Sequence, residues 1–142
     1  MGCDIHLFRE KRVGDTWQCL DPFVEVEEND GHKYIEVDDT YIPRNYDLFG
    51  FLADVRIEVP EGFAARGLPK DVSHEVNQES YRWDSDGHSH SYLLLSELKT
   101  KLTELLVAPT EYSPYYVSAV KNIVELFPQD SEEYRIVFWF DN

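Results

Sequence analysis

Two short segments of the sequence combine histidines with carboxylates. Residues 84–92 read D-S-D-G-H-S-H-S-Y, and the chain begins M-G-C-D-I-H. Imidazole and carboxylate groups bind divalent metal ions, and they also serve as general acids and bases. The chain has 5 histidines, and three of them lie in these two segments. If the fold brings the segments together, a metal site or an acid–base site is the leading interpretation.

The D-x-H-x-H pattern of Asp86, His88 and His90 has the spacing of an extended segment. Side chains two apart on a strand point to the same side, so the three could offer ligands to one ion. Zn, Mn or Mg would be the candidates. The alternative is a polar loop in which histidine and serine side chains bind backbone groups.

Asp4 and His6 also lie two apart, in a segment whose apolar residues alternate. On a strand they would share one face. The alternatives are a solvent-exposed strand start or a partly buried, hydrogen-bonded histidine. Under the single-site hypothesis, the candidate metal ligands are Asp4, His6, Asp86, His88 and His90, and the candidate catalytic residues are Asp4, His6, Asp86 and His88.

The segment Arg44-Asn45-Tyr46 lies between Pro43 and the expected start of a helix. Helix N-termini favour anions, and arginine adds a fork of hydrogen-bond donors. We therefore expect this segment to bind a phosphate or carboxylate group at the rim of the site. The alternative is a helix cap with an ion pair on the surface.

Hydrophobic periodicity and turn signals predict the elements that must position these residues. Expected strands cover residues 3–12, 16–26 (broken near Pro22), 33–37 and 134–140. Expected helices cover 47–56, 71–81, 97–106 and a segment from Ser113 to just before Pro128. Strands near both ends with helices between them predict a single α+β domain over residues 1–142. We expect a largely antiparallel sheet in which the first and last strands are neighbours.

The composition excludes several classes of function. A formal net charge of -15 disfavours broad nucleic-acid binding, which requires lysines and arginines to neutralise phosphates. No apolar run approaches the roughly 20 residues of a membrane span, and the start lacks a signal-peptide pattern. We expect a cytoplasmic protein in which Cys3 and Cys19 are free thiols. The acidity has two interpretations, solubility or mimicry of a polyanion.

Four segments, in order along the whole chain, carry a family resemblance: M-G-C-D-I-H, then R-N-Y-D-L-F-G-F-L-A-D-V-R, then R-G-L-P-K-D-V-S with D-G-H-S-H-S-Y, and finally V-F-W-F-D-N. The sequence resembles a group of small, uncharacterised bacteriophage and prophage proteins. It departs from their pattern at Tyr92, where tryptophan is usual. The resemblance implies a phage-encoded protein acting in the host bacterial cytoplasm, but it brings no established activity. Its motifs include Asp4, His6, Arg44, Asn45, Tyr46, Asp86, His88, Ser89, Ser91, Asp141 and Asn142.

Three hypotheses of function remain open. The first is a metal-dependent hydrolase of phosphoesterase type, acting on a small phosphorylated, nucleotide-like molecule. Its ligand-binding residues would be Arg44, Asn45, Tyr46, Ser89, Ser91, Asp141 and Asn142. The second is a binder that sequesters such a molecule without cleaving it. The third is an acidic inhibitor of a host protein, for example an antagonist of host defence. The oligomeric state is left open.

Overall fold

The computed structural model describes residues 2–128 and 133–142. Its central feature is a four-stranded sheet in the order β2-β1-β6-β5. All neighbouring strands in it run antiparallel. The strands are β1 (Asp4–Val13), β2 (Thr16–Cys19), β5 (Gly87–Leu94) and β6 (Tyr134–Asp141). The expected α+β fold class, with helices packed on a largely antiparallel sheet, is confirmed.

The first and last strands of the sheet are neighbours, as predicted. β1 pairs with β6 in a register that runs from Asp4 opposite Asp141 to Lys11 opposite Tyr134. The seven residues from Tyr134 to Phe140 are all buried. Such a strand is covered on both faces, which explains why its sequence is almost continuously apolar rather than alternating.

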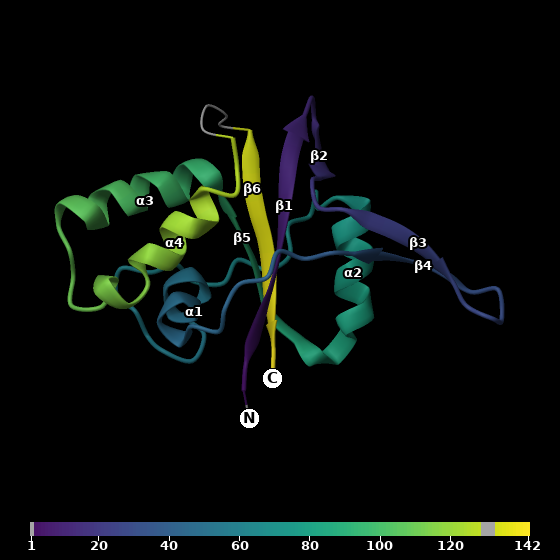
Figure 1. The fold of residues 1–142 in the computed structure, drawn as a ribbon, viewed down its shortest axis with the longest axis horizontal. Coiled ribbons are helices and arrows are strands. Elements are labelled where there is room, and N and C mark those ends of the chain that lie inside the picture. The colour runs from purple at the N-terminus through teal and green to yellow at the C-terminus, as the bar shows by residue number, and fades with distance from the viewer. Residues whose placement is uncertain (1, 129–132) are drawn as a thin grey trace.

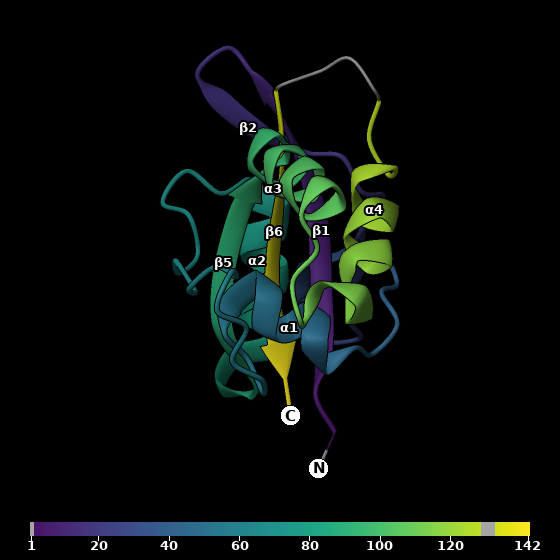
Figure 2. The ribbon, with the colours of Figure 1, turned by 90° about the vertical axis from the view of Figure 1, so that its left-hand side faces the viewer.

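Different elements cover the two faces of the sheet. Helices α1 (Tyr46–Ala53), α3 (Leu95–Val107) and α4 (Val117–Val124) lie on one face, as Figures 1 and 2 show. We call this the three-helix face. The opposite face carries α2 (His74–Trp83) and a hairpin of β3 (Phe23–Glu27) and β4 (Lys33–Val37), and we call it the α2 face. Phe138 and Phe140 belong to the core on the three-helix face, whereas Val137 and Trp139 belong to the core on the α2 face.

The expected return strand over residues 16–26 is two strands that belong to different sheets. β2 ends at Cys19, and β3 pairs with β4 in a separate two-stranded sheet. Asp21 holds the chain against β1 at the place where it leaves the four-stranded sheet. Its carboxylate accepts hydrogen bonds from the backbone N–H and the Nε of Arg9, at 2.6 and 2.9 Å. Pro22 follows and has no N–H to donate to a continuing ladder.

The helices begin at residues that satisfy their first N–H groups. The side chain of Asn45 accepts a hydrogen bond from Leu48 N at the start of α1, and that of Ser73 accepts one from Val76 N at the start of α2. The chain also forms two short 3-10 helices, η1 (Asp84–Asp86) directly before β5 and η2 (Ser113–Tyr115) directly before α4. None of the helices that the structure describes has the length and apolar character needed to cross a membrane.

Candidate functional site

His88 and His90 lie on opposite faces of the sheet, so the prediction that they point to the same side is wrong. His88 pairs with Phe140 of β6, and the two rings stack at 6.2 Å. His90 instead stacks on Trp139, at 5.4 Å. The cause is an irregularity in the strand pairing between His88 and Ser91, where Ser89 has a φ of 55°. Such a bulge inserts an extra residue and reverses the direction of the side chains that follow.

The prediction of one pocket holding His6 and His88 is wrong for the same reason. His6 pairs with Trp139 across β1 and β6, which places it on the α2 face, whereas His88 lies on the three-helix face. On that face, His88 Nδ1 is 3.0 Å from Ser89 Oγ. His88 Nε2 is buried and has no hydrogen-bond partner among the residues described. The bulge therefore leaves His90, not His88, on the same side as His6.

His6 is held between two carboxylates. Its Nε2 is 2.7 Å from Asp141 Oδ2, and its Nδ1 is 3.2 Å from Asp39 Oδ2. Its ring lies 4.0 Å from that of Trp83, at the end of α2. Burial by itself lowers the pKa of His6, but the hydrogen bonds to Asp39 and Asp141 outweigh burial and raise the pKa above its ordinary value. As an imidazolium, the ring can donate a hydrogen bond to each carboxylate at once.

The sequence patterns do not indicate that Asp39 belongs to this cluster. The segment after β4 reaches β1 through an isolated antiparallel bridge between Leu7 and Thr40. Leu7 belongs to the core on the three-helix face, and neighbours along an extended chain point to opposite faces. Asp39 is therefore directed toward the α2 face, where it meets His6. Nothing in the local pattern D-D-T signals this long-range bridge.

Of the expected metal ligands, His6 is the one that the structure places between two carboxylates, those of Asp39 and Asp141. Both imidazole nitrogens already engage a carboxylate, so a metal ion would have to displace one of them. Among residues 2–128 and 133–142, no group of three or more His, Cys, Asp and Glu side chains is arranged to hold a metal ion. Metal binding at His6 stays a prediction.

Asp4 is bound by Arg44 and makes no hydrogen bond to His6 among the residues that the structure describes. The Nε and Nη2 of Arg44 lie 3.0 and 2.9 Å from the two carboxylate oxygens of Asp4. The Arg44 hydrogen bond lowers the pKa of Asp4, which is exposed. A phosphate or carboxylate ligand at Arg44 would have to compete with Asp4 for the same fork of donors. The structure thus shows the alternative considered for this segment, a helix cap with a surface ion pair.

The other expected ligand-binding residues are dispersed. Tyr46 OH accepts a hydrogen bond from Cys3 N at 3.2 Å, and Asn142 Oδ1 accepts one from Arg56 at 3.4 Å. The buried Ser91 accepts a hydrogen bond from Arg66 N at 3.0 Å. Asp86 is exposed in η1. The Tyr46 and Ser91 contacts hold backbone N–H groups, whereas the Asn142 contact joins two exposed side chains, and none of the three involves His6 or His90.

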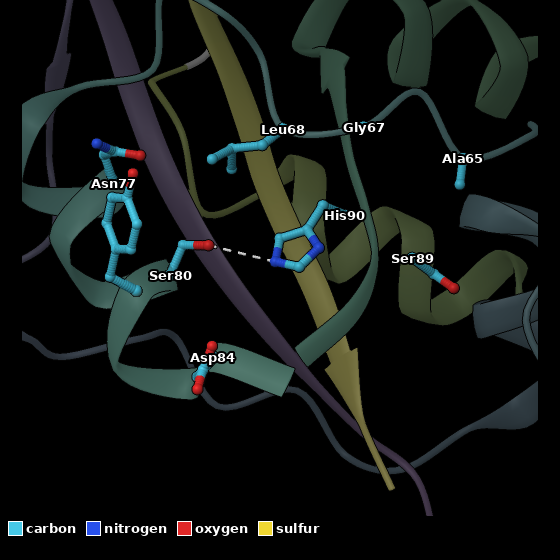
Figure 3. A pocket seen from close by; sticks show the side chains of 9 residues that line it. Ala65, Gly67, Leu68, Asn77, Ser80, Asp84, Ser89 and His90 are labelled. Carbon is cyan, nitrogen blue, oxygen red and sulfur yellow. Dashed lines mark hydrogen bonds between the residues drawn. The ribbon is translucent and has the colours of Figure 1, made fainter. Parts of the chain in front are cut away.

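A cleft opens beside His90 on the α2 face. It is an open hollow of about 590 Å³ between α2, β5 and the segment that precedes α2. His90 Nε2 lies 3.2 Å from Ser80 Oγ of α2, and Figure 3 shows this pair at the centre of the cleft. The lining residues are Ala65, Gly67, Leu68, Asn77, Ser80, Tyr81, Asp84, Ser89 and His90. Neither Ser80 nor this cleft is predicted by the sequence patterns.

The backbone around the cleft is unusual in three places. Gly67, Asp84 and Ser89 have φ values of 85°, 45° and 55°. For residues other than glycine, this left-handed region costs free energy, and such strain is concentrated at functional sites. Gly67 N also donates a hydrogen bond to the carbonyl oxygen of His90, at 2.8 Å. The cleft wall and the histidine are therefore held as one unit.

No protein-family model, curated protein or solved structure matches the chain. The resemblance to phage proteins therefore stays a prediction, and the inference of function depends on the geometry above.

Proposed function

We propose that the protein binds a small uncharged or cationic molecule in the cleft at His90. The observation that carries this proposal is the cleft itself, in which the imidazole of His90, the hydroxyl of Ser80 and the amide-bearing Asn77 border a volume of about 590 Å³. Ligand sites are typically concave, partly apolar and supplied with a few polar groups that fix orientation. If the resemblance to phage proteins holds, the ligand is a molecule of the host bacterial cytoplasm.

The charges of the cleft determine which ligands suit it. Burial lowers the pKa of His90, and the neighbouring His88 lowers it further, which favours the neutral imidazole at pH 7. The cleft residues that the structure describes include the carboxylate of Asp84 but no lysine or arginine. A phosphorylated ligand, expected from the sequence, would find no cation there. Leu68 and the ring of Tyr81 supply apolar surface for a planar group.

Four compounds that share a phenyl ring and differ in charge test this proposal: benzamide, benzamidine, benzoate and phenyl phosphate. We expect benzamide and benzamidine to shift the imidazole NMR signals of His90 with dissociation constants on the order of 1 mM, which corresponds to about −4 kcal/mol. Benzoate and phenyl phosphate should bind at least about tenfold more weakly, a difference of about 1.4 kcal/mol.

Two tryptophan substitutions separate the cleft from the rest of the surface. Ala65→Trp places a large ring in the cleft and should abolish the shifts, whereas Leu106→Trp adds the same ring at an exposed site on α3 and should leave them unchanged. Equal binding by the Ala65→Trp protein would show that the cleft is not the site. Preferential binding of phenyl phosphate would instead support the hypothesis of a phosphorylated ligand.

The β3–β4 hairpin favours a second candidate function, inhibition of a basic host protein. The hairpin projects from the body of the molecule (Figure 1). Val24 is 60% exposed, and Glu25 and Glu27 on the same strand are exposed as well. Among the described residues, β3 pairs with β4 alone, so its outer edge can accept a further strand. An acidic, partly apolar edge suits a partner strand rich in lysine or arginine.

Charge removal on the hairpin tests this second function. We expect Glu25→Gln, Glu27→Gln and Glu28→Gln together to weaken binding of poly-L-lysine at least about fivefold more than the same change at exposed Glu58, Glu111 and Glu125. Binding is measured at two salt concentrations, because the loss should shrink as salt screens the charges. Equal losses from the two triple variants would mean that net charge, and not the hairpin, governs the interaction.

A further inference from the structure

Ser80 and His90 have the arrangement of a nucleophile and its base. They come from different elements, α2 and β5, and their Oγ and Nε2 atoms are 3.2 Å apart. Within a helix, a serine hydroxyl commonly binds the carbonyl four residues earlier, but Ser80 has turned toward the imidazole. Both residues are half-buried and both line the cleft, as Figure 3 shows. A ligand in the cleft therefore meets the hydroxyl and the imidazole together.

The surroundings of His90 keep its ring in place. Trp139, which is fully buried, stacks under the imidazole with an angle of 29° between the ring planes. The hydrogen bond from Gly67 N fixes the backbone of His90. The lowered pKa favours the neutral ring at pH 7, which is the form that accepts a proton. In a catalytic triad a carboxylate orients the histidine, whereas here ring stacking and the backbone hold it.

We propose that Ser80 and His90 form a catalytic dyad that hydrolyses small uncharged or cationic carboxylic esters. This inference rests on the proposed function, because it concerns a ligand in the same cleft. Asp84 borders the cleft and favours an ester with a positively charged group. The reaction needs only the ester and water, and it differs from the metal-assisted phosphoester hydrolysis expected from the sequence.

The reaction has two steps. In the first, Ser80 Oγ forms a bond to the carbonyl carbon of the ester while its proton passes to His90 Nε2. The bond from that carbon to the alkoxy oxygen breaks, and the alcohol leaves with the proton from His90. In the second, a water molecule gives a proton to His90 and its oxygen attacks the acyl carbon. The bond from the acyl carbon to Ser80 Oγ then breaks, the carboxylic acid leaves, and Oγ takes the proton held on His90, which restores the serine hydroxyl.

An uncharged ethyl fluorophosphonate and the ester p-nitrophenyl acetate test the dyad. The fluorophosphonate should form one adduct per chain, with loss of fluoride, and peptide mass spectrometry should locate it on Ser80. Hydrolysis of p-nitrophenyl acetate should fall at least about a hundredfold in Ser80→Ala and in His90→Gln, the scale of general-base catalysis. Ser85→Ala changes an exposed serine outside the cleft and should keep both activities.

The outcomes distinguish the dyad from the binding proposal. If benzamidine binds the wild-type protein and no adduct or turnover is found, the dyad is wrong and the binding function stands. An adduct on another residue, or equal turnover by Ser80→Ala, overturns the dyad as well. If benzamide and benzamidine also fail to bind, both proposals are wrong. NMR spectra of each variant verify that it is folded.

Discussion

Replacement of Glu10 by alanine is expected to lower the free energy of unfolding by about 3–5 kcal/mol, the usual cost of breaking a buried ion pair. Glu10 is fully buried on β1, opposite Arg135 of β6. Its Oε1 accepts a hydrogen bond from Arg135 Nε at 2.7 Å, and its Oε2 accepts one from Ser73 N at 2.8 Å. The side chain of Arg135 is only 3% exposed and lies over the ring of Trp17. Without Glu10, the buried guanidinium loses its buried carboxylate.

Urea denaturation of the variants measures this loss. Glu10→Gln keeps the shape of the side chain and an oxygen that can accept from Ser73 N, so it should cost less than Glu10→Ala. Asp71 also binds Arg135, at 2.8 Å, but its side chain is 60% exposed, and Asp71→Asn should cost no more than about 1 kcal/mol. A Glu10→Ala protein within 1 kcal/mol of the wild type would contradict the prediction.

The hydrogen bond from Ser73 N to Glu10 also links the buried ion pair to the cleft. Ser73 caps α2, and α2 carries Ser80 farther along the same helix. Loss of Glu10 should therefore loosen the attachment of α2 to the sheet and weaken benzamide binding, even at temperatures where the protein remains folded.

The second large effect is a dependence of stability on pH that requires His6. Because the hydrogen bonds to Asp39 and Asp141 raise the pKa of His6 in the folded protein, folding favours its protonated form. This contribution is fully present below the ordinary pKa of histidine. It is lost as the pH rises through the higher pKa of the folded state. We expect His6→Gln to cost about 2 kcal/mol at pH 6, in line with hydrogen bonds to charged groups, and clearly less at pH 9.

Urea denaturation at pH 6 and pH 9 provides the measurement. His32→Gln makes the same chemical change at an exposed turn between β3 and β4 and should affect stability little at either pH. A His6→Gln cost that stayed constant between the two pH values would mean that His6 acts through packing on Trp83 alone.

The sequence predicts the elements of this fold better than the site. The apolar run at 134–140 and the alternating segment at 3–12 form strands because each pattern reports local burial. That the two strands are neighbours follows instead from the tendency of the termini of a single domain to lie close together. The period-two pattern gives the wrong directions for His88 and His90 because Ser89 adopts a left-handed φ, which a serine in such a pattern does not signal. Asp39 reaches His6 across 33 residues, and Ser80 reaches His90 from another element. Such meetings are decided by tertiary packing, which local periodicity does not encode.

The central position of β6 constrains the order in which the protein can assemble. His6 and Asp141, on neighbouring strands, lie 135 residues apart in the sequence. During synthesis on the ribosome, β1 and β5 both emerge before the strand that separates them in the sheet. A nascent chain that stops before Tyr134 presents two unpaired strand edges and an incomplete apolar core. Delayed translation of β6 would therefore leave the residues that precede it exposed to aggregation until β6 can pair with β1 and β5.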